Sequence, residues 1–232
     1  MKVLLFGATG MIGGGALLEC LADDRVSSVL AIVRSPLGVF HPKLEELQHQ
    51  DYLRFSPLQG HLIGYDACFF CLGVSAVGVD EVTYTHITYE VTLAAAHAFQ
   101  AANPIGTFCY ISGAGTDSTE HGARMWARVK GRTENALLAL GRTYMFRPGF
   151  IQPVKGVHSK TAWYNLLYSL LAPVSPVLRR WCPGAATTTA ALGRALIRVG
   201  LEGFRPGSYD PRYQPFGHHS LSTAHLGRRE IS

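Results

Sequence analysis

The sequence opens with MKVLLFGATGMIGGG, residues 1–15. Residues 3–6 form a short apolar run of strand formers, glycines follow at positions 7, 10 and 13, and helical spacing resumes over residues 16–22. This order predicts a strand, a glycine turn and a helix. Such a turn directs the unpaired N–H groups at the start of the helix toward one point, where a pyrophosphate can bind with help from the helix dipole. We therefore expect a dinucleotide-binding unit here.

Each of the three glycines has a separate task in this interpretation. Gly7 allows the tight turn, Gly10 lets the backbone approach the phosphates, and Gly13 lets the helix pack closely on the strand. One alternative is a glycine-rich turn that binds nothing. A second is a cleaved signal peptide, because Lys2 is followed by apolar residues. The glycines interrupt that apolar region and no strong small-residue cleavage site follows, which argues against the second alternative.

Composition limits the class of protein. The chain has 232 residues, of which 47% are hydrophobic and 16% charged, so we expect one globular domain with a large core. The net charge is +5, but Lys and Arg are scattered, which argues against a nucleic-acid partner. Five cysteines without a disulfide-framework spacing favour a reducing compartment and a cytoplasmic location. Cys68 and Cys71 have redox spacing but lie in an apolar strand, where residues three apart face opposite ways. No cluster has metal-ligand spacing.

Strands and helices alternate along the first two thirds of the chain. The pattern predicts strands over 26–33, 66–73, 107–112 and 143–147, helices over 80–102 and 118–140, a short polar helix over 41–50, and a weak strand over 52–55. Alternation of this kind is typical of an α/β fold with a Rossmann-type, doubly wound parallel sheet.

The ends of two predicted strands add cofactor contacts. A unit that prefers NAD carries Asp or Glu near the end of its second strand, whereas this chain has Arg34 there. A guanidinium can pair with a 2′-phosphate, so the sequence favours NADP over NAD. The alternative is a solvent-exposed arginine at a strand end. Leu72, Gly73 and Val74 follow the central strand, at the sheet edge where ligands of α/β proteins lie, so we expect them beneath the cofactor.

Three side chains suggest a reactive centre. Ser112 leaves a strand at the same edge, where its hydroxyl could hydrogen-bond a substrate carbonyl. Trp126 and Lys130 are four residues apart and so share one face of the next helix. The structural alternatives are a strand-ending hydroxyl, a packed aromatic ring and a solvated lysine.

These stretches resemble the short-chain dehydrogenase/reductase superfamily, in its atypical branch with epimerase-like and reductase-like members. Within that branch the chain is similar to the group containing the oxidoreductase-like Tat-interacting protein. The resemblance runs from residue 1 to about 200 and includes the motif at residues 146–149. It implies a set of cofactor-binding residues: Gly7, Thr9, Gly10, Met11, Ile12, Gly13, Arg34, Leu72, Gly73, Val74, Lys130 and Pro148.

The resemblance also implies a catalytic serine at Ser112, a tyrosine at position 126 and a lysine at Lys130. In the family, the tyrosine transfers the hydroxyl proton, the lysine lowers its pKa and holds the nicotinamide ribose, and the serine orients the carbonyl. Position 126 is tryptophan, and an indole N–H cannot serve as a general acid or base at physiological pH.

The departure at Trp126 leaves more than one function open. The first is an NADP-dependent oxidoreductase of a small carbonyl or alcohol substrate, with Ser112 polarising the carbonyl and the proton delivered by water through Lys130 or by a hydroxyl such as Thr116. The second is an NADP-binding regulatory or redox-sensing protein without turnover. A sugar-nucleotide epimerase is a lesser alternative, because the C-terminal lobe is short.

The last third of the chain predicts a small substrate-side lobe over about 150–185 and a final helix over 187–201, which complete one domain over 1–202. An apolar segment at 161–171 is too short and too interrupted by proline to span a membrane. It could form a lid, a homodimer contact or, least favoured, an interfacial membrane contact. From residue 203 onward the apolar residues no longer recur at regular spacing, which predicts a flexible tail over 203–232.

Overall fold

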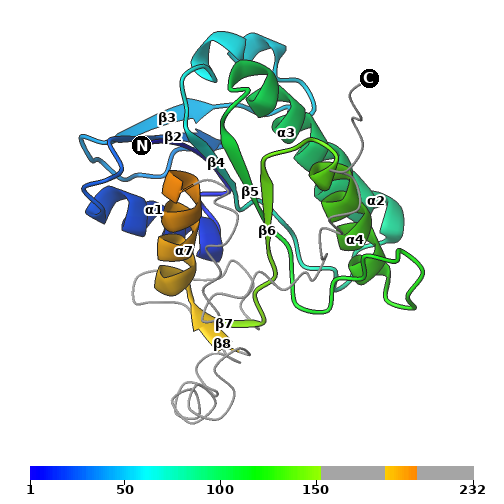
Figure 1. Ribbon diagram of the computed structural model, residues 1–232. Helices are drawn as coiled ribbons and strands as arrows, with labels where there is room; N and C mark the ends of the chain where they lie inside the picture. Colours follow the sequence, from blue (N-terminus) through cyan, green and yellow to red (C-terminus); the bar gives the residue numbers. More distant parts are fainter. Residues whose placement is uncertain (153–185, 203–232) are drawn as a thin grey trace, which may run out of the picture.

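The computed structural model describes residues 1–152 and 186–202 and is built on a six-stranded parallel sheet (Figure 1). In chain order its strands are β1 (Lys2–Phe6), β2 (Ser28–Val33), β3 (Leu44–Gln48), β4 (Ala67–Phe70), β5 (Thr107–Ile111) and β6 (Thr143–Phe146). Their spatial order is β3-β2-β1-β4-β5-β6, and every pair is parallel. This is the Rossmann order, so the predicted fold class is confirmed. The order reverses between β1 and β4, which places the ligand edge beside them.

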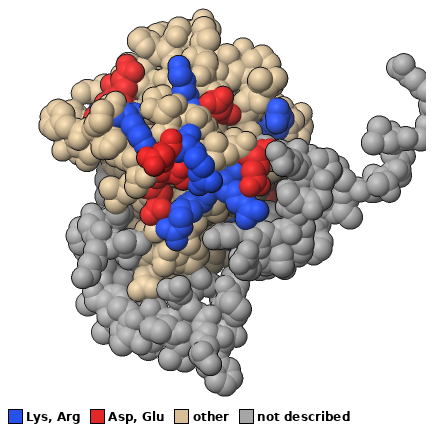
Figure 2. Space-filling model, turned by 60° about the vertical axis from the view of Figure 1, so that its left-hand side comes forward, with Lys and Arg blue, Asp and Glu red and all other residues tan. Residues whose placement is uncertain are grey.

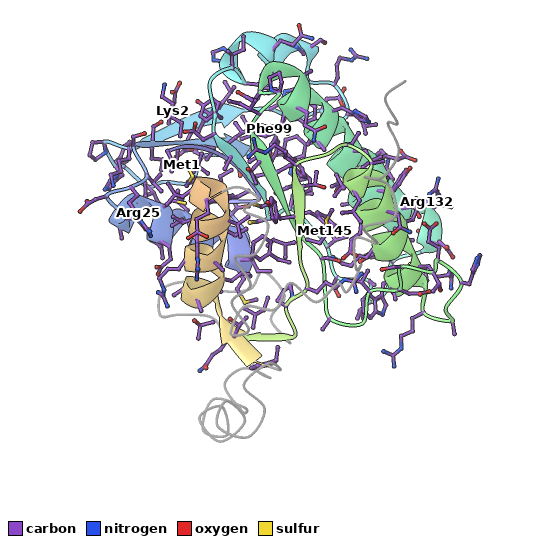
Figure 3. The ribbon with its side chains drawn as sticks, viewed as in Figure 1. Met1, Lys2, Arg25, Phe99, Arg132 and Met145 are labelled. Carbon is purple, nitrogen blue, oxygen red and sulfur yellow. The ribbon has the colours of Figure 1, made fainter. Side chains whose placement is uncertain are left out.

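Helices cover both faces of the sheet (Figure 1). One face is covered by α1 (Met11–Ala22) and α7 (Thr189–Glu202), whose side chains join a core cluster with β1, β2, β4 and β5. On the other face, α2 (Glu81–Thr85), a π-helical turn (His86–Glu90) and α3 (Val91–Ala102) form one run beside α4 (Met125–Leu138). Phe99 points from α3 onto the sheet (Figure 3), where it is fully buried. The predicted helix over 80–102 is thus present.

Small residues let α1 and α7 lie close together. A Cβ added at Gly15 would be 2.5 Å from Cβ of Thr189, and one added at Gly193 would be 2.9 Å from Cγ of Glu19. Gly15 follows the glycine turn at residues 7–13 because α7 crosses α1 too closely there for a side chain. Before α7, a second small sheet pairs β7 (Phe150–Gln152) with β8 (Ala186–Thr188) in parallel.

The prediction of a helix over 41–50 is wrong, because residues 44–48 form β3 and pair with β2. Leu and Glu favour helices in isolation, but the exposed edge of β2 offers a row of backbone partners that outweighs this preference. Residues 52–55 are a turn rather than a strand, and a 3₁₀ helix follows at Ser56–His61. The rings of Tyr52 and Phe55 pack edge-on against Phe6, at 5.9 and 5.8 Å between centroids.

The predicted helix over 118–140 begins later, at Met125. Residues 118–124 form a loop instead, in which both carboxylate oxygens of Asp117 accept backbone N–H bonds, from Thr119 at 3.0 Å and from Gly122 at 2.6 Å. Asp117 therefore caps this loop and not α4. Backbone groups that the side chain satisfies within a loop no longer favour continuing the helix.

Two further predictions concern residues that lie largely or wholly outside the described chain. Of the predicted lobe over 150–185, the strand at 150–152 is described, while 153–185 lie outside, as does the predicted tail over 203–232. Within the described residues, no helix is long and apolar enough to cross a membrane. Cys68 and Cys71 belong to opposite core clusters of the sheet, which agrees with the expected opposite orientation.

Candidate active site at the carboxyl edge of the sheet

The glycine turn after β1 is built from close backbone contacts. Gly7 has a φ of +79°, and a Cβ there would lie 2.7 Å from the backbone of Cys71 and Leu72. A Cβ at Gly13 would lie 2.1 Å from the carbonyl oxygen of Gly7, far inside van der Waals contact. The N–H of Gly10 donates to the same carbonyl at 2.8 Å. These contacts leave no room for side chains and bring the start of α1 against β1 and the end of β4.

The start of α1 fits an anionic ligand. Its N-cap, Gly10, provides no side-chain hydrogen bond, and its first turn has no acidic residue. By contrast, α2 begins at Asp80, whose carboxylate accepts the Thr83 N–H at 2.9 Å, and has Glu81 in its first turn. The protein therefore supplies its own negative charge at α2 and supplies none at α1. A pyrophosphate would provide the missing charge and the missing acceptors.

The other predicted cofactor residues lie along the same edge. Arg34 directly follows β2 and is exposed, and its carbonyl accepts a hydrogen bond from the Gln50 amide at 2.6 Å. Gly73 and Val74 are exposed just after β4, beside Leu72. Because all six strands are parallel, these positions and the glycine turn share the carboxyl edge of the sheet.

Ser112 follows β5 at this edge and is buried, with 6% of its surface exposed. Its Oγ lies 2.9 Å from Oγ1 of Thr116, which in turn donates to the Gly113 carbonyl at 2.7 Å. Since Thr116 uses its one hydroxyl hydrogen on that carbonyl, Ser112 is the donor of the shared bond. The lone pairs of Ser112 then remain for a further donor, and a substrate carbonyl would compete with Thr116 for its hydrogen.

Trp126 and Lys130 meet the backbone that follows Ser112. A Cβ added at Gly115 would lie 3.5 Å from the Trp126 ring, and one at Gly113 would lie 3.9 Å from that ring and 4.0 Å from Cδ of Lys130. The structure thus brings together the serine, tryptophan and lysine positions that the sequence singled out. The Trp126 ring is partly buried and packs beside the loop.

The ammonium group of Lys130 lies against β5. Its Nζ donates to the Ile111 carbonyl at 3.3 Å and lies 5.4 Å from the centre of the Tyr110 ring. Burial lowers the pKa of Lys130 to about 8, and the carboxylate of Glu134 opposes that shift. A lysine in this state can hold or release a proton near neutral pH.

The loop between Ser112 and α4 is held firmly. A Cβ at Gly131 would overlap the Asp117 carbonyl oxygen at 1.7 Å, so the loop lies directly on α4. The guanidinium of Arg128 donates to the Gly122 carbonyl at 2.9 Å and pairs with Glu81 of α2. At the end of β6, the Ala114 N–H donates to the carbonyl of Pro148 at 2.9 Å, which ties the predicted cofactor residue Pro148 to the same loop.

One group beside the site was missed from the sequence. Glu134 and Arg147 form a buried ion pair, with 3% and 14% of their side chains exposed. Glu134 lies one helical turn after Lys130, a spacing that could have indicated it. In the sequence, Arg147 stands out only as part of the motif at residues 146–149.

Several charges elsewhere on the described surface form ion pairs. Glu19 of α1 pairs with Arg194 of α7, and Arg198 pairs with Glu202. Figure 2 shows Lys and Arg interleaved with Asp and Glu on the face turned to the viewer.

Comparison with known proteins supports the fold. No protein-family model matches the chain. A curated relative, the protein fmp52-2, mitochondrial, of Aspergillus oryzae, is 26% identical over 151 residues, which are 63% of this chain and 66% of that protein. The match therefore spans slightly less than two thirds of the relative's length.

Solved structures give a broader likeness. WbmH of Bordetella bronchiseptica, solved with NAD+, has a TM-score of 0.61 at 18% identity, over 87% of this chain and 72% of that one. MoeE5, solved with UDP-glucose and NAD, has a TM-score of 0.65 at 17% identity, over 88% of this chain and 73% of that one. Identity this low shows the fold alone. That fold is the Rossmann-type α/β fold, and both of these solved structures contain NAD.

Proposed function

We propose that the protein is an NADP-dependent oxidoreductase of a small carbonyl or alcohol substrate. The observation that carries the proposal is the position of Ser112 and Lys130 at the same sheet edge as the glycine turn. A nicotinamide dinucleotide supplies hydride transfer when it is bound. The backbone at residues 7–13 would hold its pyrophosphate, and the lysine its nicotinamide ribose.

The chain's own residues divide the remaining tasks. Ser112 is buried and hydrogen-bonded, so its hydroxyl is held in place to orient a substrate oxygen. Lys130, with a pKa of about 8, can supply a proton through water at neutral pH. Thr116 holds Ser112 and offers a second hydroxyl for proton transfer. Trp126 packs beside the loop at Gly113 and Gly115 and donates at most one hydrogen bond.

A second candidate is an NADP-binding regulatory or redox-sensing protein without turnover, and Trp126 favours it. The indole stands where the resemblance implies the proton-transferring phenol, and neither Ser112 nor Thr116 has a hydroxyl that ionises near neutral pH. Both candidates share the cofactor. A cofactor measurement therefore tests their common basis before any substrate is sought.

The first experiment is calorimetric titration of the purified protein with NADPH and then NADH, after removal of any copurified nucleotide. We expect NADPH to bind more tightly, because Arg34 is exposed at the end of β2 and free to reach a 2′-phosphate. Equal affinity for both would contradict the NADP assignment. No binding of either would contradict both functions.

The substitution Arg34→Asp tests how much the 2′-phosphate of NADPH contributes to binding, apart from the rest of the cofactor. We expect NADPH affinity to fall about 10-fold to 100-fold while NADH affinity changes little, because only the former carries the group that a guanidinium pairs with. Arg142→Asp is the matched control, since Arg142 is exposed before β6, at the opposite edge of the sheet. Equal losses for both cofactors would exclude Arg34 as the selecting residue.

We also propose a cytoplasmic location, on the basis of the five cysteines and their lack of a disulfide framework. Cys20, Cys68, Cys71 and Cys109 are free thiols in the described residues. The name of the Aspergillus relative places that protein in mitochondria, which makes this organelle the alternative. Fractionation of cells that produce the full chain distinguishes the two.

A further inference from the structure

The buried ion pair beside Lys130 has no task in the function proposed above. Arg147 follows β6 and Glu134 lies on α4, and both Nε and Nη2 of the arginine donate to the carboxylate. The Nε contacts measure 3.0 and 3.1 Å. Nη2 also donates to Oγ of Ser118 at 2.7 Å, which ties the loop after Ser112 to the pair. The arginine thus holds the carboxylate at two points and the loop at a third.

The ion pair adjoins the site through Glu134. Lys130 and Glu134 are four residues apart on α4 and therefore neighbours on one helical face. Arg132 lies between them in sequence but points away from the sheet (Figure 3), where it stacks on Tyr89 at 4.3 Å. Without a stronger partner, the buried carboxylate of Glu134 would pair with the lysine ammonium. Arg147 is that stronger partner, because its planar fork matches a carboxylate at two points.

Few other groups act on Lys130 in the described residues. From β5, the Ile111 carbonyl accepts its hydrogen bond and the Tyr110 ring lies below it. The Tyr110 phenol stays neutral, because burial raises its pKa far above the usual value. Glu134 is therefore the charge that decides whether the ammonium turns toward its own helix or stays against β5.

We propose that Arg147 is a positioning residue for Lys130: it holds the Glu134 carboxylate in a two-point ion pair, and so leaves the lysine ammonium at the sheet edge beside Ser112. The inference rests on the proposed function in that Lys130 is the group to be positioned. It assigns no new chemical step. It explains why a buried carboxylate four residues from the lysine does not capture it.

The state of Lys130 can be measured without substrate or cofactor. The chain has five lysines, at positions 2, 43, 130, 155 and 160, so ¹³C-labelled lysine gives a small set of NMR signals to follow against pH. Lys130→Arg identifies the signal of interest. In the parent protein we expect that signal to titrate near pH 8.

Two substitutions should move the Lys130 pKa in opposite directions. In Arg147→Met the released carboxylate pairs with the ammonium, so we expect the pKa to rise by about one pH unit or more. In Glu134→Gln the carboxylate is lost and a buried guanidinium remains, so we expect the pKa to fall. Arg128→Met is the matched control, because it removes a pair with Glu81 on a different side of α4 and should leave the pKa unchanged.

A purely structural role for the pair would not produce opposite shifts. If the pKa of Lys130 shifts in the same direction in Arg147→Met and Glu134→Gln, or does not shift in either variant, the proposal is overturned. If Arg147→Met does not fold, Arg147→Lys still tests it, since a single ammonium holds the carboxylate at one point and should give a smaller rise. The experiment requires no turnover. A failure of the proposed function, seen as absent cofactor binding, is therefore distinguishable from a failure of this inference.

Discussion

The two halves of the candidate site are built in different ways. The glycine half, residues 7–13 between β1 and α1, is made of backbone contacts so close that a side chain at Gly13 would overlap the Gly7 carbonyl at 2.1 Å. The hydroxyl half is made of side chains, namely Ser112, Thr116, Trp126 and Lys130, brought together by β5, a loop and α4. Backbone contacts tolerate no substitution, whereas side-chain contacts can be rearranged. The unusual residue of this site, Trp126, accordingly lies in the hydroxyl half.

The largest effect should come from the glycine half. Gly13→Val places atoms where the Gly7 carbonyl lies, so we expect the free energy of unfolding to fall by about 3 kcal/mol or more and cofactor binding to be lost. Denaturant unfolding and calorimetry measure both. Gly60→Ala is the control, because Gly60 lies outside the candidate site and nothing lies within 4 Å of its added methyl group. Similar losses of stability in the two variants would show that close packing does not define the glycine half.

Trp126→Tyr tests whether the hydroxyl half can be returned to ordinary proton transfer. A phenol there could exchange a proton with a substrate oxygen, so we expect carbonyl reduction with a panel of simple ketones to rise by about 100-fold. Trp126→Phe keeps an aromatic ring without the hydroxyl and should give no gain. If the tyrosine variant is also inactive, more than one group has been lost from the pocket.

The charge of Lys130 should make stability depend on pH. Burial lowers its pKa from 10.5 to about 8, so the folded protein binds this proton more weakly than the unfolded chain does. The resulting penalty is fully present below pH 8 and disappears as the pH rises toward 10.5. We expect Lys130→Met to be more stable than the parent at pH 7 by on the order of 2 kcal/mol.

Urea unfolding of the Lys130→Met variant and its parent at pH 7 and pH 10 measures that difference. The difference in the free energy of unfolding should be smaller at pH 10, because Lys130 of the parent is then neutral in the folded state. A gap that stays constant across this range would mean that lost packing, and not the buried charge, causes the change.

The smallest effect should come from the hydrogen bond between the two hydroxyls. Thr116→Val keeps the shape but removes the acceptor for Ser112 and the donor to Gly113, so we expect a loss of about 1 kcal/mol in the free energy of unfolding. Thr116→Ser restores both bonds and should recover most of the loss. Thermal unfolding of the three proteins is sufficient. Equal stability of the valine and serine variants would show that the bond contributes nothing.

The glycine half could be predicted closely from the sequence. Its internal contacts join residues six apart or fewer, and Gly7 also leaves room for the backbone of Cys71 and Leu72. Only glycine satisfies these contacts, so the residue types themselves specify the turn. The alternation of apolar segments likewise determined the parallel sheet, because buried parallel strands read as continuous apolar runs. Both features are specified mainly by local sequence patterns.

Where the sequence alone failed, distant partners decided the outcome. Residues 44–48 favour a helix but lie beside the open edge of β2 and become β3, while Asp117 caps a loop that delays the start of α4 to Met125. The pairing of Glu134 with Arg147, thirteen residues apart, likewise appears only once α4 and β6 pack together. Local propensity amounts to tenths of a kcal/mol per residue, whereas each strand hydrogen bond contributes about 1 kcal/mol and a buried charge left without its partner costs about 3 to 5 kcal/mol. The sequence by itself determined the parallel sheet and the glycine turn, and tertiary contacts decided the groups that surround Lys130.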